Sequence, residues 1–378
     1  MKQQAPDILF VINNFSFLKS HRLGQIKFLS ERGLKISICT DCKNVKGQEI
    51  EGLRNTGIEV IHLNLSRSSI GIFRNMKSLI KLLFVILKIK PKKLSLISAK
   101  PIVIGGLISL FYRFEKVYFS ITGLGYAFID PSIKARFIKN IITNIYRIIF
   151  LKKRVAVIFQ NHDDLNLFLK RRIVTLDKCV VISGNGIDTS LFNSKREKSQ
   201  KIRFLFASRL LKDKGIREFV EAVDRLGSKE ATFTIVGDLD LENPNCISEE
   251  YFHRIKENPD ISYIGKVEHS QMPDLFNSSD IFVLPSYREG LPQVALEAAS
   301  CKMPLILSDV EGCRECITNK KNGYLVKKGN SEHLEKKMRF FIDNPEVSEK
   351  MGEESRKYIN ERFSKEKIYN SLYQLYSN

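Results

Sequence analysis

Residues 203–226, RFLFASRLLKDKGIREFVEAVDRL, carry the pattern that decides the fold. The apolar run Arg203–Ala207 has the length of a buried strand, and a helical pattern follows over Gly215–Leu226. Another strand-like run, Thr232–Val236, comes directly after the helix. Strand, helix and strand in this order predict a mostly parallel sheet that is covered by helices on both faces.

The same alternation extends in both directions along the chain. Downstream, the sequence predicts strands at 261–263, 281–284 and 304–307, with helices at 272–277 and 292–301. Upstream, strand-like runs lie at 7–14, 35–40, 58–65, 94–98, 117–121 and 155–160, and a helix over about 20–32 ends at Gly33. The predicted fold class is therefore α/β, with two Rossmann-like doubly wound domains.

A turn-rich segment separates the two halves. Residues 180–192 are rich in Gly, Asn, Asp and Ser, which favour a connection over a helix or strand. A chain of 378 residues also fits two cores better than one. We expect an N-terminal domain over 1–184 and a C-terminal domain over 185–364. A last helix over about 365–378 is expected to pack back on the first domain.

The positive charge of the chain lies entirely in the first half. Residues 1–180 hold 31 Lys and Arg against 11 Asp and Glu, a net charge of +20, whereas residues 181–378 hold 30 against 31, a net charge of −1. Such an asymmetry indicates that one domain faces an anionic partner, either a nucleic acid or an anionic membrane surface.

Two stretches of the first half favour the membrane. Ile72–Lys93 and Ile133–Arg154 interleave basic residues with Ile, Leu and Phe, and neither has the uninterrupted apolar length of a membrane span. They suit helices that lie in the bilayer interface, with Lys and Arg toward the lipid headgroups. The alternative is a pair of ordinary core-facing helices with a solvated basic rim.

The N-terminal residues and the cysteines suggest an intracellular protein. Residues 1–7 are polar, and the apolar run that follows is too short for the core of a signal peptide. Seven cysteines, an odd number, fit a reducing compartment. We expect a cytoplasmic protein that associates peripherally with the inner face of the cytoplasmic membrane. Two pairs with CxxC spacing, Cys39/Cys42 and Cys313/Cys316, are either buried apolar residues or a four-thiolate zinc site, and we favour the former.

Arg209 and Lys214 are spaced as an anion site. Arg209 follows the strand that opens the second domain, and Lys214 lies five residues later, where a helix begins at Gly215. Free backbone N–H groups and the helix dipole favour a phosphate at such a position. Two cations there can neutralise a diphosphate leaving group without a metal ion. The alternative is a solvated pair of basic residues beside a turn.

A second segment, PSYREGLPQVAL over Pro285–Leu296, supplies two carboxylates together with the residue that follows it. Glu289 lies in the loop before a helix that is predicted to begin at Pro292, and Glu297 lies about a turn and a half inside that helix. The two carboxylates can then accept hydrogen bonds from sugar and ribose hydroxyls in one crevice. The alternatives are that Glu289 caps the helix and that Glu297 lies on the surface.

These segments resemble a known family. The EGLPQVALE segment is similar to the signature of the family 4 retaining glycosyltransferases, which have the GT-B fold, and RLLKDKG is similar to that family's phosphate-binding segment. Three further segments fit the family, namely SGNGID at 183–188, SDVEGCRE at 308–315 and NGYLV at 322–326. The resemblance implies two Rossmann-like domains that face each other across a cleft.

The first half resembles one branch of that family. Four segments are similar to bacterial enzymes that extend polyprenyl-diphosphate-linked sugars in O-antigen, capsule and glycan assembly, including N-acetylgalactosaminyltransferases: SHRLGQIKFL at 20–29, AKPIVIGGL at 99–107, ITGLGYAF at 121–128 and QNHDDLNLF at 160–168. One segment departs from the family. Many members have a Gly-Gly loop after the first strand, where this chain has Asn13-Asn14-Phe15-Ser16.

The resemblance implies a role for each candidate residue. Catalysis falls to Arg209 and Lys214, which would bind the donor diphosphate, and to Glu289, which would hold the transferred sugar. The implied donor-binding residues are Arg209, Lys214, Val267, Glu289, Gly290, Leu291, Pro292 and Glu297, with Glu297 on the ribose and Val267 near the base. The candidates for the acceptor are His21, Arg22, Lys100, Thr122 and Gly123.

The resemblance also implies the reaction. It is transfer of a hexose or N-acetylhexosamine, with N-acetylgalactosamine from a UDP-sugar as the leading choice, onto a polyprenyl-diphosphate-linked saccharide, with retention at the anomeric carbon. No cofactor is expected besides the nucleotide sugar, and no nucleic acid is expected as a partner. Asp238-Leu239-Asp240 imitates a metal-binding DxD, although a plain turn after a strand is the favoured reading. The alternatives are a nucleotide-sugar epimerase or hydrolase of the same fold and a basic nucleic-acid-binding protein.

Overall fold

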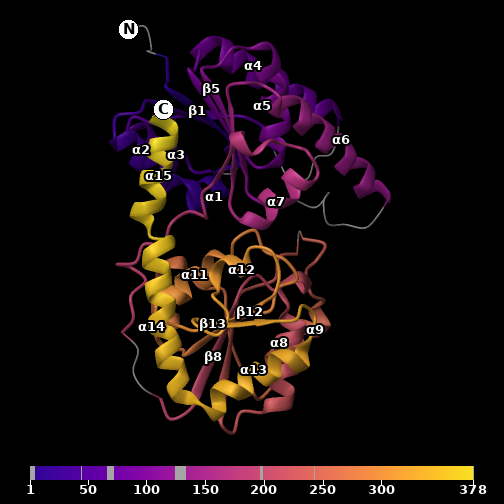
Figure 1. Ribbon diagram of the computed structural model, residues 1–378, viewed down its shortest axis with the longest axis vertical. Coiled ribbons are helices and arrows are strands. Elements are labelled where there is room, and N and C mark those ends of the chain that lie inside the picture. Colours follow the sequence, from indigo (N-terminus) through magenta and orange to yellow (C-terminus); the bar gives the residue numbers. More distant parts are fainter. Residues whose placement is uncertain are drawn as a thin grey trace. The chain divides into compact units, whose positions relative to one another are not determined.

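The computed structural model describes residues 5–43, 45–65, 72–123, 133–195, 199–241 and 243–377. These residues form two compact units (Figure 1). The first unit comprises the described residues up to Asn185 and the segment that starts at Tyr369, and the second unit comprises Gly186–Ile368.

The first unit is built on a parallel seven-stranded sheet. Its order is β3-β2-β1-β4-β5-β6-β7, and Phe10 of β1 lies opposite Ile38 of β2 and Ser95 of β4. The strands are short and largely buried because helices cover the sheet, which explains their nearly continuous apolar sequences. Their bounds are β1 Ile8–Asn14, β2 Ile36–Asp41, β3 Glu59–His62, β4 Lys93–Ile97, β5 Lys116–Ile121, β6 Val155–Phe159 and β7 Cys179–Val181.

Helices connect these strands and cover both faces of the sheet. Apolar residues of α4, α5, α6 and α7 pack on one face and share its core. On the other face lies the C-terminal helix α15, whose Tyr376 ring contacts the rings of Phe10 and Tyr118 at centroid distances of 5.4 and 4.6 Å. The helical bounds are α1 Phe15–Phe17, η1 Leu18–Arg22, α2 Leu23–Glu31, α3 Gly47–Arg54, α4 Ile72–Ile89, α5 Ala99–Phe111, α6 Ile133–Phe150, α7 His162–Lys170, η3 Leu176–Lys178 and α15 Lys365–Ser377.

The second unit repeats the architecture on a parallel six-stranded sheet of order β10-β9-β8-β11-β12-β13. Its strands are β8 Ile202–Ala207, β9 Ala231–Val236, β10 Ile261–Gly265, β11 Ile281–Leu284, β12 Leu305–Ser308 and β13 Gly323–Val326. Its helices are η4 Lys212–Lys214, α8 Ile216–Leu226, α9 Glu249–Glu257, η5 His269–Gln271, α10 Met272–Asn277, α11 Gln293–Ser300, α12 Cys313–Cys316, α13 Ser331–Asp343 and α14 Pro345–Arg362. The α/β class with two doubly wound units, predicted from the sequence, is confirmed.

Each sheet contains one point at which the chain reverses its direction of travel. This point lies between β1 and β4 in the first unit and between β8 and β11 in the second. In open parallel sheets, ligands bind beyond the carboxyl ends of the two strands at this switch point. The topology thus directs attention to the segments that follow these four strands, and these segments include Arg209 and Glu289.

Three predicted helix starts require correction. The helix that was expected from Gly215 begins at Ile216, because Gly215 has a left-handed backbone (φ 74°) and Lys212–Lys214 form a separate 3₁₀ turn. The helix that was expected from Pro292 begins at Gln293, because the ψ of Pro292 is 96° and therefore non-helical. Near the N-terminus, the single helix expected over about 20–32 is a π-helical turn, Leu18–Arg22, followed by α2.

The length and apolar character of the helices bear on whether the chain can cross a membrane. Among the residues that the structure describes, no helix is long and apolar enough to cross a membrane. The two basic and apolar stretches do form long helices, α4 and α6. Each buries one face, as Leu82 and Ile86 of α4 and Tyr146 and Ile149 of α6 show. Both helices therefore contribute to the core, as the alternative interpretation required.

Candidate active site

Two loops meet at the switch point of the second unit. One follows β8 and runs from Arg209 to Gly215, and the other follows β11 and runs from Pro285 to Gly290. A Cβ atom on Gly215 would lie 2.1 Å from the carbonyl oxygen of Pro285, so only glycine permits this approach. The backbone N–H of Tyr287 donates a hydrogen bond of 2.8 Å to the carbonyl of Asp213. The two loops thus form one packed surface.

Lys214 and Glu289 form an ion pair on this surface. Lys214 Nζ lies 2.6 Å from Glu289 Oε1, and the side chains are 19% and 10% exposed. The hydroxyl of Ser286 donates to the same carboxylate oxygen at 2.8 Å. Glu289 is therefore held by one donor from the neighbouring loop and one from its own, and its second oxygen, Oε2, accepts neither of these bonds. The predicted phosphate-binding lysine and the predicted sugar-binding carboxylate are brought into direct contact.

Arg209 lies at the same edge with a different partner. Its Nη1 lies 2.6 Å from Asp240 Oδ2, and the Arg209 side chain is 57% exposed. Asp238 Oδ1 accepts the backbone N–H of Leu239 at 2.8 Å, as in a turn. The second carboxylate of the DxD sequence is thus engaged by Arg209. Within the described ranges no group of three or more His, Cys, Asp and Glu side chains is arranged to hold a metal ion.

The chain after Glu289 leads directly into α11. Gly312, with φ 75°, packs so closely on this segment that a Cβ atom there would lie 2.4 Å from the carbonyl of Gly290 and 2.6 Å from that of Glu289. Leu291 packs against the core of the unit, and Pro292 is the N-terminal capping residue of α11 with no side-chain capping hydrogen bond. The alternative in which Glu289 caps this helix is therefore wrong.

Glu297 lies on the buried side of α11. The residue is only 4% exposed, so the alternative of a surface residue is wrong as well. Its Oε1 lies 3.0 Å from Nε2 of His269, and this hydrogen bond raises the pKa of the imidazole above 6.5. A carboxylate only accepts, so Nε2 of His269 carries the proton. Val267, the candidate base contact, precedes His269 by two residues and packs against the core of the unit.

The acceptor candidates all lie at the carboxyl edge of the sheet in the first unit. His21 and Arg22 end η1, Lys100 lies in the first turn of α5, and Thr122 and Gly123 follow β5. His21 is exposed and stacks on Phe17 at 4.8 Å, whereas Arg22 is buried. The two side chains are adjacent in sequence but lie in different environments, His21 in solvent and Arg22 in the interior. The hydroxyl of Thr122 lies 3.2 Å from the hydroxyl of Ser98, the residue that follows β4.

Ser98 itself has a strained backbone. Its φ of 79° and ψ of 162° fall in a region that only glycine adopts readily. It lies between β4 and α5, at the switch point of the first unit, and its N–H donates to the carbonyl of Ser120 at 3.1 Å. Strain of this kind accumulates at binding sites, and it could not be predicted from the sequence because the residue is not glycine.

The cysteines of the two CxxC pairs are distributed between the units. Cys39 lies in β2 and Cys42 follows it, whereas Cys313 and Cys316 begin and end α12 of the second unit. Burial raises the pKa values of the Cys313 and Cys316 thiols well above 9, which disfavours the thiolates that a zinc site needs. Cys39, Cys313 and Cys316 lie in the hydrophobic cores, as the favoured interpretation requires, whereas Cys42 is only partly buried.

The comparison with protein families decides the class of this site. Residues 188–358 match the family model described as "Glycosyl transferases group 1", and this range contains the Lys214–Glu289 pair, Arg209 and Glu297. The chain contains a group 1 glycosyltransferase domain. The match falls entirely within the second unit, where the two loops meet.

Curated relatives extend the likeness of this glycosyltransferase to most of its length. It is 29% identical over 339 residues, 86% of each chain, to the N,N'-diacetylbacillosaminyl-diphospho-undecaprenol alpha-1,3-N-acetylgalactosaminyltransferase of Campylobacter jejuni. It is 26% identical over 373 residues to the capsular polysaccharide biosynthesis glycosyltransferase CapM of Staphylococcus aureus, covering 94% of this chain and 92% of CapM. The first unit is therefore part of the shared sequence.

Solved structures share the fold of both units. Sucrose-phosphate synthase from Thermosynechococcus elongatus has a TM-score of 0.79 at 17% identity, covering 99% of this glycosyltransferase and 98% of that chain. Anabaena HepE in complex with UDP and glucose has a TM-score of 0.76 at 16% identity, covering 99% and 100%. These likenesses show the GT-B fold, which agrees with the sequence-based expectation.

Proposed function

We propose that this glycosyltransferase moves a hexose or N-acetylhexosamine from a UDP-sugar onto a polyprenyl-diphosphate-linked saccharide. N-acetylgalactosamine, α-linked with retention, is the first donor sugar to test. The Campylobacter relative is named for transfer of this sugar to an undecaprenyl-diphosphate-linked acceptor, and HepE was solved with UDP. Both names support the choice of substrates, and surface polysaccharide assembly is the setting that the CapM likeness suggests.

The Lys214–Glu289 ion pair carries this proposal. It joins the two loops of the switch point, where a nucleotide sugar would lie with its diphosphate near the cations and its sugar near the carboxylate. Glu289 Oε1 is occupied by Lys214 and Ser286, so Oε2 is the atom proposed to accept a sugar hydroxyl. The same contact keeps Lys214 at the edge where the leaving diphosphate develops its charge.

The proposed reaction exchanges one bond at the anomeric carbon for another. The bond between this carbon and the donor diphosphate breaks, and a hydroxyl of the acceptor forms the new glycosidic bond on the same face. The proton of that hydroxyl passes to an oxygen of the departing diphosphate, so no protein base is required. Arg209 and Lys214 stabilise the negative charge of the nucleoside diphosphate as it leaves, and we propose that they make a metal ion unnecessary.

The basic first unit is proposed to meet the lipid-linked acceptor at an anionic membrane surface. Besides their buried faces, α4 exposes Met76, Ile80, Phe84 and Leu87, and α6 exposes Phe137, Ile141 and Ile148. In each helix these side chains lie on one stripe, because successive members are three, four or seven residues apart and therefore share one face of the helix. Lys77, Lys81 and Lys88 of α4 and Arg136 of α6 lie on the same helices as these stripes.

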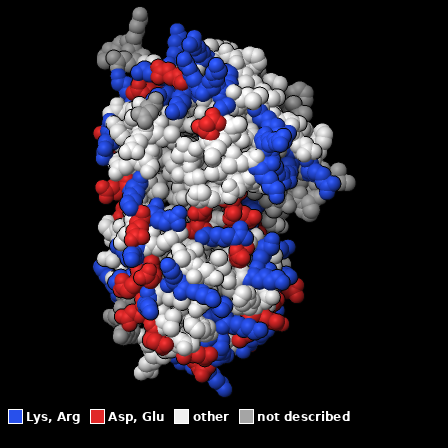
Figure 2. Space-filling model, in the orientation of Figure 1, with Lys and Arg blue, Asp and Glu red and all other residues white. Residues whose placement is uncertain are grey.

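The surface view agrees with this charge distribution. Figure 2 shows Lys and Arg side chains gathered over parts of the first unit, whereas basic and acidic side chains are intermixed over the second. An exposed apolar stripe on a basic helix suits the boundary between headgroups and acyl chains. The proposed partner is therefore an anionic membrane, which also presents the polyprenyl diphosphate.

A donor and acceptor screen tests the proposed function. Purified protein is incubated with radiolabelled UDP- and GDP-sugars and with a polyprenyl-diphosphate-linked monosaccharide, and the lipid fraction is counted. Transfer of label to the lipid is the expected result, and Glu289→Gln should abolish it while the matched exposed-site variant Glu311→Gln keeps it. Equal activity after EDTA treatment is expected.

Two outcomes would contradict the proposal. Conversion of the nucleotide sugar at the same rate with and without lipid acceptor would indicate an epimerase or hydrolase. Retention on nucleic acid, but not on anionic vesicles, at moderate salt would indicate that the basic unit serves a different partner.

A further inference from the structure

Arg22 is a buried cation in the first unit. It ends η1, directly before α2, and is only 7% exposed. Its Nη1 donates a hydrogen bond of 3.0 Å to Oε1 of Gln25, one turn later in the chain. Its Nε is buried with no hydrogen-bond partner, and no carboxylate pairs with the guanidinium among the residues that the structure describes.

This arrangement is energetically costly. Burial lowers the pKa of Arg22 to about 10, so the group still carries its charge at neutral pH. A buried charge normally has a paired partner, because leaving water costs several kcal/mol that only such a partner offsets. A hydrogen bond to a neutral amide is a weak substitute. Native proteins retain features of this kind mainly where a ligand completes them.

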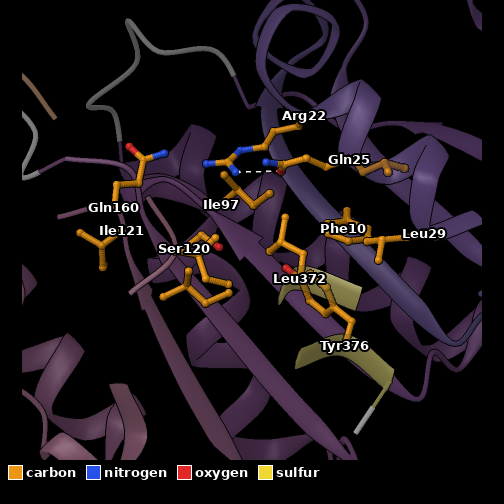
Figure 3. Close-up of a pocket in the computed structure, with 13 residues that line it drawn as sticks. Phe10, Arg22, Gln25, Leu29, Ile97, Ser120, Ile121, Gln160, Leu372 and Tyr376 are labelled. Carbon is orange, nitrogen blue, oxygen red and sulfur yellow. Dashed lines mark hydrogen bonds between the residues drawn. The ribbon is translucent and has the colours of Figure 1, made fainter. Parts of the chain in front are cut away.

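A small cavity lies beside the guanidinium. Its volume is about 20 Å³, and it lies at the carboxyl ends of β4, β5 and β6, where Ile97, Ile121 and Gln160 contribute to its wall. Figure 3 shows Arg22 reaching from η1 across the cavity toward Gln160, with Ser120 and Tyr376 on the opposite wall. Among the residues that the structure describes, no Asp or Glu lines it. A space of this size holds one water molecule or one oxygen atom, but not a whole phosphate.

The guanidinium N–H groups that do not bond to Gln25 determine which ligand group can bind to Arg22. Nη1 is engaged by Gln25, which leaves Nε and Nη2 as a planar pair of donors. Two donors in this geometry match two oxygens of a phosphate. The cavity that Arg22 lines has room for one of these oxygens, so a phosphate that used it would keep its other oxygens outside the cavity.

We propose that Arg22 is the receptor for a phosphate or diphosphate group bound at the first unit. The inference rests on the proposed function for the identity of the group, because both the UDP-sugar and the polyprenyl acceptor carry a diphosphate. The binding site itself stands on the geometry around Arg22. Gln25 orients the guanidinium, and Gln160 is placed to donate its amide N–H to the same ligand.

Thermal shift titrations of the full chain test this proposal. The probes are pyrophosphate, UDP and the soluble lipid analogue geranyl diphosphate. They are added to the Lys214→Ala variant, so that the donor site of the second unit no longer contributes its lysine. We expect at least one diphosphate to raise Tm in this background. Adding Arg22→Met should weaken its apparent affinity at least tenfold, and Arg22→Lys should give an intermediate value because lysine offers no planar pair of donors.

The matched control is Arg113→Met, which removes one exposed positive charge from the opposite, amino-terminal edge of the same sheet. It should leave the affinities unchanged. The probe whose affinity depends on Arg22 identifies the source of the phosphate, UDP indicating the donor and geranyl diphosphate the lipid. Loss with all three probes indicates a general diphosphate site.

The Tm without ligand separates a binding role from a structural one. Removal of an unpaired buried charge should leave the Tm of Arg22→Met equal to or above that of the parent. A clear fall in Tm without ligand, or unchanged affinities for all three probes, would overturn the proposal. Failure to detect sugar transfer with any donor would leave Arg22-dependent binding intact, so failure of the proposed function is distinguishable from failure of this inference.

Discussion

Lys214 is the residue whose replacement tests the proposed mechanism most directly. Replacement of Lys214 by alanine removes the cation that lies 2.6 Å from Glu289 and, in the proposed complex, its contact with the leaving diphosphate. Preorganised donors of this kind are worth a factor of about 10² to 10³ in kcat, or about 3–4 kcal/mol. We therefore expect kcat of Lys214→Ala to fall by about this factor.

The effect on folding should be smaller than the effect on catalysis. Glu289 keeps its hydrogen bond from Ser286 and retains some access to water, so the loss of Lys214 leaves the carboxylate only partly unsatisfied. An acceptor in this position costs about 1–3 kcal/mol of unfolding free energy, less where solvent reaches it. The variant should therefore fold, with Tm lowered by a few degrees in a unit of this size.

Steady-state kinetics at saturating acceptor measure the effect, and a thermal melt measures the stability. Lys212→Ala is the matched control, because Lys212 is an exposed lysine in the same 3₁₀ turn. It should keep kcat within about twofold. Turnover of Lys214→Ala within about threefold of the wild-type value would refute the assignment of Lys214 to the leaving group.

Three other substitutions lead to four further predictions. His269→Ala should raise the KM for the donor about two- to fivefold with little change in kcat, because a partly exposed pair of this kind contributes about 0.2–1 kcal/mol to holding Glu297. The His269 contribution to stability is fully present below pH 6.5 and is lost as pH rises through the raised folded pKa, so melts of wild type and His269→Ala should converge at high pH. Ser98→Gly should raise Tm by about 2–4 °C, because relief of about 1–3 kcal/mol of backbone strain exceeds the entropy cost of glycine. An unchanged Tm would argue that the backbone of Ser98 is not strained. Phe84→Glu should reduce the fraction of protein that sediments with anionic vesicles by tenfold or more, because burial of one phenylalanine is worth about 1.5–3 kcal/mol. The control Leu241→Glu, at an exposed site in the second unit, should leave this fraction unchanged.

The sequence predicts the fold well because the strands are buried on both faces. Continuous apolar runs such as Ile8–Ile12 and Ile281–Leu284 can be recognised without knowledge of their neighbours. The loops at the switch point could also be placed, since Arg209 and Glu289 directly follow predicted strands. The pairing of Lys214 with Glu289, 75 residues apart, could not be derived from spacing, because it depends on which strands are adjacent in the sheet.

Other features depend on local geometry that a periodic pattern does not encode. The N–H of Leu23 bonds to the carbonyl of Leu18, five residues earlier, so η1 contains one residue more than an α-helical turn. Each added residue rotates the following side chains by about 100° relative to those before. A helix read with period 3.6 over residues 20–32 therefore misjudges which side chains face the sheet, and Arg22 is one that faces inward. The sequence did not predict a role for His269, because this residue contacts Glu297 from a short 3₁₀ turn that has no periodic pattern.

The partners of the candidate cations predict how each should respond to a ligand. Arg209 is exposed, and its contact with Asp240 contributes little in water, so an incoming diphosphate can replace Asp240 at small cost. Lys214 is more buried and is held through Glu289 and Ser286 to a rigid loop, so it should stay in place and share its remaining N–H groups with the ligand. Arg22 has no carboxylate to exchange among the described residues, so a phosphate there gains the full interaction with an unpaired charge. Arg22 should therefore supply most of the charge interaction at the first unit, whereas loss of Arg209 alone should weaken the donor site without abolishing it.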